Sequence, residues 1–464
     1  MKNAVSNNKF FLLLLLAYLL LAGTMIFRLP AFSGPNEVLH YEHVALLRLT
    51  GKLPDLQTST RADERHQPPV YYGLAALLSL PFPQPALDSA FTPNPYFIST
   101  IRGNLNPYLN LSPANVPVLY ASRFTALLFG LLTVSAMYGM ARQSMSVEMS
   151  LLITSLVAFQ PMFLFLSTTA NNDIAVTAVA ALLLAYSTHL LLNDNSPRRY
   201  LFWGILFGLA MLSKASAIFL ITLLPILLCV RWLKNRQIRD VLFSAVWAAV
   251  GFLPIWAAWL FINFQRSGDA LGLAPSVPIR HLLTLSPFDF GLLLPFANWL
   301  FKSFWLDWSP GDVGFGPPWV YWAWLLFYAM AVTGWFRFKA KFRQPSSLIL
   351  IHLTWSAALI GVFLAVKTLM VRDVGFLVPE GRWLLPTWPS LAWLVGAGWN
   401  RWWSPAKQKP ANLTVAFASF ASILLLFIFL FPTLYPQARR LETGARYPRK
   451  CASCWQTVWR GTLY

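Results

Sequence analysis

The residues of this chain that could carry out chemistry gather in one stretch, residues 30–116. Three of the chain's six histidines lie there: His40, His43 and His66. Five acidic residues fall within 28 residues of the same stretch: Glu37, Glu42, Asp55, Asp63 and Glu64. Carboxylates serve as general bases, and carboxylates with imidazoles bind divalent metal ions. Because the stretch is too long for a passive connection and too apolar for a disordered linker, we expect it to hold a functional site.

Glu37 is the first candidate for a catalytic base, and Asp63 or Glu64 is the second. A structural role competes in the case of Glu37, because an acid in the first turn of a helix, after an Asn36 cap, is favoured by the helix dipole. His40 could equally be an ordinary surface histidine. A second acid-rich turn further along the stretch favours the functional interpretation of both.

Two short helices are expected to position these groups. The first spans 37–49, between Pro35 and Gly51. At about 100° per residue, one of its sides carries Glu37, His40, Tyr41, Val44 and Arg48, and the other carries Val38, Leu39, Leu46 and Leu49. Such a helix would lie along the membrane surface with its apolar side down. Glu37 and His40 would then point together toward whatever lies beside it.

The second helix is expected within 70–82, which is too short to span a membrane and is therefore interfacial or re-entrant. R-A-D-E-R-H at 61–66 is followed by Q-P-P-V-Y-Y at 67–72, in which Pro68 and Pro69 force an extended lead-in to this helix. His40, His66 and Glu64 could together hold a divalent metal ion. Their spacing, however, matches no defined metal signature.

The composition of the whole chain indicates the environment of these helices. Of its 464 residues, 57% are hydrophobic and only 11% are charged, whereas soluble domains carry roughly a quarter of charged residues. The mean hydropathy is +0.54. Such a chain cannot coat a water-facing surface, which excludes a soluble enzyme, a disordered tail and a nucleic-acid-binding protein despite the isoelectric point near 10.1. Three cysteines cannot form a disulfide framework.

Runs long enough to cross a bilayer, which takes about 20 apolar residues, recur along the chain. They lie at about 10–29, 117–141, 149–169, 174–192, 200–213, 215–233, 241–262, 318–336, 347–366, 383–400 and 412–434. The first run could instead be a signal peptide, although no A-x-A-like cleavage site follows it. The predicted fold is an all-α polytopic membrane protein with about eleven transmembrane helices.

The distribution of basic residues predicts a cytoplasmic N-terminus. This orientation places 16 of the 36 Lys and Arg residues in cytoplasmic loops and tails, and 14 of the 17 acidic residues on the other side. The candidate site would then be extracytoplasmic, and the protein would lie in the plasma (inner) membrane.

The predicted organisation is a single transmembrane domain over 1–464, with a first extracytoplasmic loop at 30–116 and a second at 263–317. The second loop is aromatic and interrupted by prolines, which suits interfacial helices that wall an acceptor cleft or lipid groove, or a cover resting on the membrane. The tail 435–464 is basic and contains Cys451-x-x-Cys454. With eleven spans it lies outside, where this pair could form a disulfide, and one span more or fewer would place it in the cytoplasm.

Several motifs occur in a fixed order. An acid follows the first predicted span, with a histidine three residues on, and a Pro-Pro-φ-Tyr-Tyr sequence opens a helix. Downstream come A-N-N-D at 170–173, G-L-A-M-L-S-K at 208–214 and P-E-G-R-W-L-L-P at 379–386. Together they resemble the GT-C superfamily, membrane glycosyltransferases such as protein O-mannosyltransferases and lipid A aminoarabinose transferases. The resemblance covers about residues 30–400.

The resemblance implies inverting transfer of a sugar from a polyprenyl-phosphate carrier to a glycan, lipid or protein acceptor, within membrane lipids and without nucleic acid. Arg382 is the main candidate for binding the phosphate, and Lys214 is the second. Asp173, Tyr71 and His40 are further substrate-binding candidates. Structural alternatives exist: an interfacial anchor for Arg382, a snorkelling side chain for Lys214, and a helix cap for Asp173.

One position departs from the family pattern. The family usually opens with Asp-Glu, whereas this chain has Asn36-Glu37. Either Glu37 takes over the role of the missing acid, or an acid at 63–64 does, or this member is altered in activity.

Two other functions compete with glycosyl transfer. A transporter or flippase of lipid-linked substrate would carry ionisable residues within its spans and internal repeats. The predicted spans hold almost no charge at mid-depth, and the two halves of the chain show no repeat. A non-catalytic membrane assembly subunit gains weight from Asn36. No nucleotide is expected as donor or cofactor, because the chain has no Gly-rich phosphate-binding motif.

Overall fold

The structure is a computed structural model, and it describes residues 2–29, 31–32, 34–56, 64–85, 91–93, 108–111, 113, 115–193, 196–272, 293–306, 318–336, 345–374 and 380–402. Several predicted features lie outside these residues. They are Asp63, the span at 412–434, most of the loop at 263–317, and the tail 435–464 with Cys451 and Cys454.

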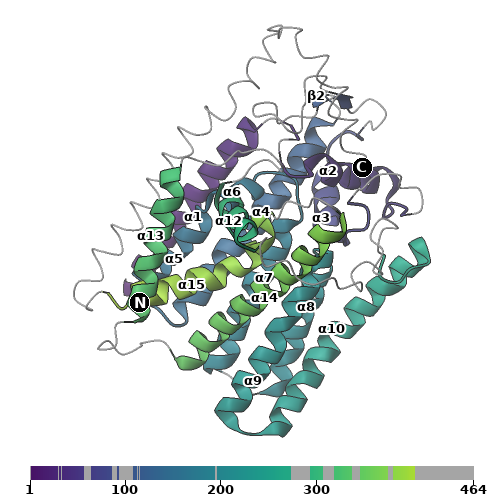
Figure 1. The fold of residues 1–464 in the computed structure, drawn as a ribbon. Helices are drawn as coiled ribbons and strands as arrows, with labels where there is room; N and C mark the ends of the chain where they lie inside the picture. Colours follow the sequence, from purple (N-terminus) through teal and green to yellow (C-terminus); the bar gives the residue numbers. More distant parts are fainter. Residues whose placement is uncertain are drawn as a thin grey trace.

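The described part of the chain is almost entirely helical (Figure 1). Its first half contains α1 (Lys2–Arg28), α2 (Glu37–Thr50), α3 (Pro69–Ser79), α4 (Val116–Arg142), α5 (Val147–Ala158), α6 (Pro161–Leu166) and α7 (Asp173–Asn193). Its second half contains η1 (Pro197–Arg199), α8 (Tyr200–Met211), η2 (Ala215–Thr222), α9 (Leu223–Asn235), α10 (Ile238–Ser267), α12 (Leu293–Leu306), α13 (Pro318–Trp335), α14 (Ser346–Val374), η4 (Gly381–Thr387) and α15 (Trp388–Trp399). Two short antiparallel strands, β1 (Phe91–Pro93) and β2 (Tyr108–Leu111), pair with each other.

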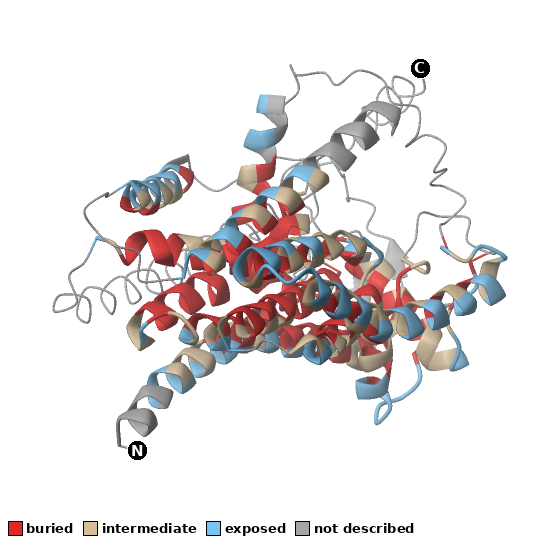
Figure 2. Cartoon of the chain, turned by 90° about the horizontal axis from the view of Figure 1, so that it is seen from below, coloured by how far each residue is buried: buried red, intermediate tan, exposed pale blue. Residues whose placement is uncertain are grey.

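Five helices of the described part are long and apolar enough to cross a membrane. They are Lys9–Arg28, Val116–Arg142, Asp173–Asn193, Ala215–Asn235 and Ile238–Ser267, and shorter apolar helices accompany them. Buried residues gather in the centre of the molecule, and exposed residues lie on its outer faces (Figure 2). The outer face of α10 is lined by exposed Leu, Val and Phe side chains, a surface that water would not tolerate. The all-α polytopic membrane fold is therefore confirmed, whereas the number of eleven spans stays a prediction.

Glycines set the closest helix crossing. A Cβ atom on Gly204 of α8 would lie 2.0 Å from the carbonyl oxygen of Ala248, and one on Gly251 of α10 would lie 2.2 Å from that of Leu201. The two backbones can touch only because both positions lack a side chain, as small residues commonly allow in membrane helices. This crossing fixes α8, which ends just before Lys214, against α10.

Two predicted spans are broken in the structure. The run 149–169 is divided into α5 and α6 at Gln160-Pro161, because Pro161 has no N–H to continue the helix and the Gln160 side chain accepts the N–H of Phe163. The run 383–400 begins as the 3-10 helix η4, with Pro386 inside it, and only then becomes α15. Breaks of this kind place polar backbone inside the helical bundle.

The predicted helix at 37–49 is observed as α2, and it ends at Gly51, which adopts the left-handed conformation with φ 66°. Four residues of the side that carries Glu37 are buried: Glu37, His40, Tyr41 and Val44. The opposite side is only partly buried. The amphipathic prediction therefore identified which side of α2 faces the rest of the protein.

Candidate active site

The carboxylate of Glu37 is fully buried in an ion pair with Arg123 of α4. It accepts hydrogen bonds from Arg123 Nε at 2.8 Å and Nη2 at 2.9 Å. The backbone N–H of Ala170 donates to it at 2.9 Å, and that of Gly34 at 3.1 Å. Because its exposed fraction is 0%, the carboxylate has no face open to a substrate in this arrangement.

Arg123 extends this ion pair to the end of α1. Its Nη1 donates to the carbonyl oxygens of Ile26 at 3.0 Å and Leu29 at 2.9 Å, which the ending helix leaves without partners. The pair thus joins α1, α2, α4 and the turn before α7. Glu37 and Arg123 hold together the segments that carry the other polar side chains of the site.

Glu64 lies beside the start of α2 and is only partly buried. The side-chain amide of Asn36 donates to Glu64 Oε1 at 3.0 Å, and the ring of His43 contacts the Glu64 carbonyl oxygen at 3.0 Å. Burial by itself would raise the pKa of this carboxyl, but His40, Lys214 and the Asn36 hydrogen bond outweigh it and lower the pKa to about 2. Glu64 is therefore an ionised, partly accessible carboxylate at neutral pH.

His40 is buried one turn along α2 from Glu37, and its Nδ1 lies 2.8 Å from the hydroxyl of Tyr72. His43 stacks on the same tyrosine, with ring centroids 3.8 Å apart. Burial is the main cause that lowers the pKa of His40 to about 4, so its ring is neutral at pH 7. The charge of Glu64 raises this pKa and that of Lys214 lowers it, and both effects are smaller than that of burial.

Three distant motifs meet in a second ion-pair cluster. Lys214 Nζ donates to Asp173 Oδ1 at 2.5 Å, and Arg382 Nη1 donates to Asp173 Oδ2 at 3.1 Å. Arg382 Nε also bonds Glu380. An ammonium has three donors and a guanidinium five. Within the described part of the chain these contacts use one donor of Lys214 and two of Arg382, so donors remain for an anion.

Gln67 and Tyr71 connect the two clusters. Gln67 Oε1 accepts from Asn172 Nδ2 at 3.1 Å and from the backbone N–H of Ala215 at 3.3 Å. The Tyr71 hydroxyl donates to the Ser122 carbonyl at 2.8 Å and accepts the N–H of Asn171 at 3.2 Å. Tyr71 is fully buried, so these contacts orient the turn before Asp173.

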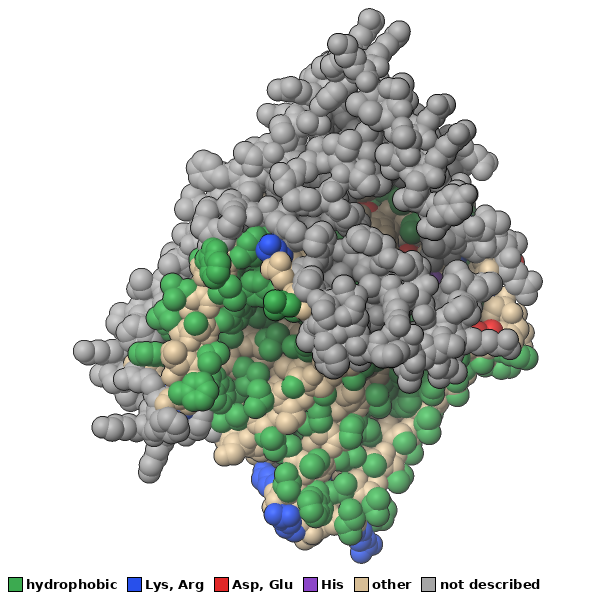
Figure 3. All heavy atoms as spheres, in the orientation of Figure 1, with side chains coloured by type: hydrophobic (Ala, Val, Ile, Leu, Met, Phe, Trp, Pro, Cys, Tyr) green, Lys and Arg blue, Asp and Glu red, His purple; other side chains and the backbone are tan. Residues whose placement is uncertain are grey.

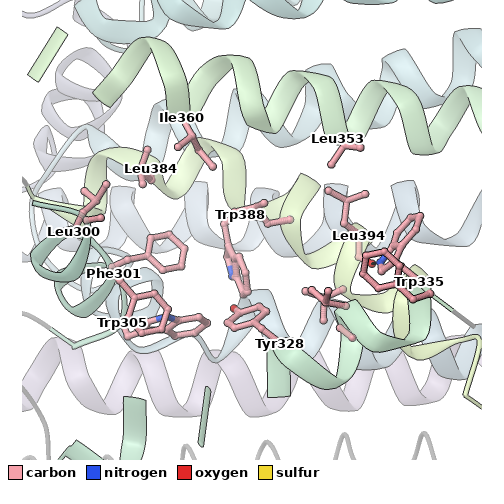
Figure 4. Close-up of a pocket in the computed structure, with 17 residues that line it drawn as sticks. Leu300, Phe301, Trp305, Tyr328, Trp335, Leu353, Ile360, Leu384, Trp388 and Leu394 are labelled. Carbon is pink, nitrogen blue, oxygen red and sulfur yellow. Dashed lines mark hydrogen bonds between the residues drawn. The ribbon is translucent and has the colours of Figure 1, made fainter. Parts of the chain in front are cut away.

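An apolar cavity of about 810 Å³ lies beside η4, the helix that carries Arg382 (Figure 4). Residues of α12, α13, α14, η4 and α15 line it, with the rings of Trp305, Tyr328 and Trp388 close together. Leu384, two residues after Arg382, forms part of its lining. α12 is the described part of the predicted loop at 263–317, and it supplies one wall.

Gly381 fixes this wall to the ion-pair cluster. Its N–H donates to Ser303 Oγ at 2.8 Å, and a Cβ atom on it would lie 2.1 Å from the backbone nitrogen of Phe304. The backbones of η4 and α12 can approach this closely only because residue 381 is glycine. The residue before Arg382 therefore packs against α12, which supplies one wall of the cavity.

The chain is similar to known membrane glycosyltransferases. The family described as dolichyl-phosphate-mannose-protein mannosyltransferase matches residues 118–259, which run from α4 into α10. The structure of ArnT from Cupriavidus metallidurans in the apo state is 15% identical with a TM-score of 0.50, and the match covers 96% of this chain and 76% of that one. The same protein bound to undecaprenyl phosphate is 14% identical with a TM-score of 0.48, covering 92% and 73%. A comparison with curated protein sequences found no match.

The matching family and the ArnT-like fold agree with the motifs that meet at the site. The family match extends over residues 118–259, and the likeness to the apo ArnT structure extends over most of the chain. At these identities the likeness to solved structures concerns the fold, and the roles of individual residues depend on the geometry above.

The structure brings most of the predicted site residues into two clusters. Asp173, Lys214 and Arg382 bond directly, and His40 and Glu64 lie beside them. The predicted metal set of His40, His66 and Glu64 does not form a ligand group. Among the described residues no group of three His, Cys, Asp or Glu side chains could hold a metal ion, and the His66 ring contacts the Gln67 side chain at 3.0 Å.

Sequence reasoning missed several residues of this site: Arg123, Gln67, Tyr72, His43 and Glu380. Gln67 and Tyr72 stood inside a motif that was singled out as a whole. Arg123 had a clear signal, because it is a charged residue inside a predicted span, and such residues face the interior of the bundle with a partner.

Proposed function

We propose that the enzyme transfers a sugar from a polyprenyl-phosphate carrier to an acceptor on the extracytoplasmic side of the membrane. The observation that carries this proposal is that η4 belongs to two opposite environments: its Arg382 shares Asp173 with Lys214, and its Leu384 lines the aromatic cavity. A polyprenyl phosphate has a matching pair of parts, an anionic head and a long apolar tail. The proteins of the matching family are described as using dolichyl phosphate mannose.

The cations would act mainly on the leaving group. As the bond between the sugar C1 and the phosphate oxygen breaks, negative charge accumulates on the polyprenyl phosphate. Lys214 and Arg382 are held by Asp173 before the reaction, so little reorganisation is needed to stabilise this charge. The apolar cavity would take the tail, since each buried CH₂ group contributes roughly 0.8 kcal/mol.

The acceptor hydroxyl would attack C1 directly from the face opposite the phosphate, which inverts the configuration. Its proton passes to a carboxylate of the first outer loop, and the bonding electrons leave with the phosphate. A single displacement of this kind needs one base and one anion site, and the two clusters supply both.

A cytoplasmic N-terminus in the plasma membrane belongs to the same proposal. Lys and Arg side chains appear at the end of the molecule where α9 and α10 join, below a broad apolar surface (Figure 3). This turn contains Lys234, Arg236 and Arg239. The acidic and histidine side chains visible in that view lie toward the other end of α10. Basic loops favour the cytoplasmic side, which leaves the candidate site outside.

The test is a transfer assay in proteoliposomes with labelled polyprenyl-phosphate sugars, run on wild type, Lys214→Gln and Arg382→Gln. Each variant should lose about 10²–10³-fold in kcat, the usual effect of removing one preorganised contact to developing charge. Lys234→Gln is the matched control, because that lysine also makes a partly buried hydrogen bond, but to the Leu191 carbonyl near the opposite end. Full activity of both site variants would refute the phosphate assignment, and lipid binding without transfer by wild type would favour a flippase or assembly subunit.

A further inference from the structure

The carboxylates around the site differ in what they already bind. Glu37 is enclosed by Arg123, and Asp173 by Lys214 and Arg382. Glu380 pairs with Arg382, and Glu42 pairs with Arg65 at 3.1 Å. Within the described residues Glu64 has no ion pair, and its side chain accepts a hydrogen bond from a neutral amide, that of Asn36, at 3.0 Å.

We infer that Glu64 is the catalytic base of the proposed transfer and that Asn36 is the residue that positions it. This inference rests on the proposed function, and it gives the amide at position 36 a physical role. An aspartate there would put a second carboxylate about 3 Å from Glu64, and the two like charges would repel. Asparagine has the same shape and instead offers an N–H.

The backbone around Glu64 is held from two helices. His43 of α2 bonds the Glu64 carbonyl, and Arg65 pairs with Glu42 one residue before His43. From the end of α10, Arg266 Nη2 donates to the carbonyls of Pro54 at 2.6 Å and Arg65 at 3.0 Å. These contacts hold the backbone of a loop residue in place, which a base needs if it is to meet a reacting hydroxyl.

The charges around Glu64 also suit a base that works only with the donor bound. Lys214 is one of the groups that lower its pKa, together with His40, His66 and the Asn36 amide. A phosphate anion bound to Lys214 would offset that charge and raise the pKa of Glu64 toward the range in which a carboxylate accepts a proton well. Binding of the donor would thus prepare the base.

In the transfer step the acceptor O–H proton goes to Glu64 Oε, and the acceptor oxygen forms a bond to the sugar C1. The bond from C1 to the phosphate oxygen breaks with its electron pair. Polyprenyl phosphate leaves as the anion held by Lys214 and Arg382, and Glu64 then releases its proton to water. No co-reactant is required.

The decisive variant exchanges the two groups. Glu64→Gln should lower kcat by about 10²–10⁴-fold, the usual contribution of a general base. The double variant Asn36→Asp with Glu64→Gln transfers the carboxylate from position 64 to its hydrogen-bond partner at position 36 and keeps an amide opposite it. Its kcat should be at least tenfold higher than that of Glu64→Gln alone. The backbone allows the exchange, because residue 36 has φ 54° and Asn and Asp both tolerate this region.

Chemical rescue separates a base from a structural residue. Glu64→Ala should regain activity as formate is added, because a small carboxylate can occupy the space and accept the proton. Glu42→Ala removes a carboxylate of α2 and is the matched control, whose activity should show no dependence on formate. Polyprenyl phosphate binding, measured as a thermal shift in nanodiscs, should be unchanged in Glu64→Gln and weakened in Lys214→Gln.

The outcomes distinguish this inference from the proposed function. Wild type that transfers sugar, with Glu64→Gln equally active or with no recovery in the double variant or formate experiment, would overturn the assignment of Glu64 and leave the function standing. Wild type that neither binds polyprenyl phosphate nor transfers its sugar would overturn both.

Discussion

Replacing Glu37 by glutamine would show whether this acid holds the fold together or takes part in chemistry. In the folded protein its two oxygens accept four hydrogen bonds, two from Arg123 and one each from the N–H groups of Ala170 and Gly34. A glutamine has only one oxygen, and its NH₂ group would face N–H donors. Arg123, which is 1% exposed, would keep its charge and lose its counter-ion.

The size of the effect follows from this burial. Removing one partner of a buried ion pair destabilises a protein by about 3–5 kcal/mol, because the remaining charge stays uncompensated. This corresponds to a loss of about 10²–10⁴-fold in the ratio of folded to unfolded protein. Glu42 of the same helix pairs with Arg65 of the following loop, with side chains 32% and 22% exposed, and such pairs contribute about 0–1 kcal/mol.

The assay is the apparent melting temperature of detergent-solubilised protein, followed by size-exclusion chromatography after heating. Glu37→Gln should melt well below wild type, whereas Glu42→Gln should melt close to it. Replacing Glu37 and Arg123 together by methionine should restore part of the loss, since no charge is then left unpaired. If Glu37→Gln melted like wild type while losing transfer activity, the structural role would be refuted and the acid would belong to the chemistry.

Two further predictions concern packing and pH. Gly381→Ala should lower transfer activity and should lower stability by about 1–3 kcal/mol, because the new Cβ meets the Phe304 backbone. Gly361→Ala is the control and should lower neither, since a Cβ there has no atom within 4 Å. Equal melting temperatures of the two variants would contradict the packing of η4 on α12. Burial lowers the pKa of His40 to about 4 and that of His43 to about 3. Between pH 6.5 and about 4 the unfolded chain therefore binds protons that the folded protein does not, and stability should fall with decreasing pH by about 3 kcal/mol per unit. A melting temperature that stays constant from pH 7 to 5 would contradict these burials.

Local signals in the sequence were enough to predict much of this site. Pro35 and Gly51 bracket α2, and the spacing of its residues identified its buried side, because helix periodicity and caps depend on neighbours a few positions apart. The motifs around Asp173, Lys214 and Arg382 were expected to act together, and the structure joins them by ion pairs.

The sequence by itself determined that the chain is a polytopic helical membrane protein, since apolar content and periodicity are properties of the linear chain. It also predicted the segments in which we expect the chemistry. Only the tertiary structure decided how the acids differ. The partner of Glu37 lies 86 residues away in α4, and Glu64 receives an amide from 28 residues earlier. Whether a carboxylate is enclosed or accessible depends on the groups that packing brings around it, and spacing along the chain does not contain that information.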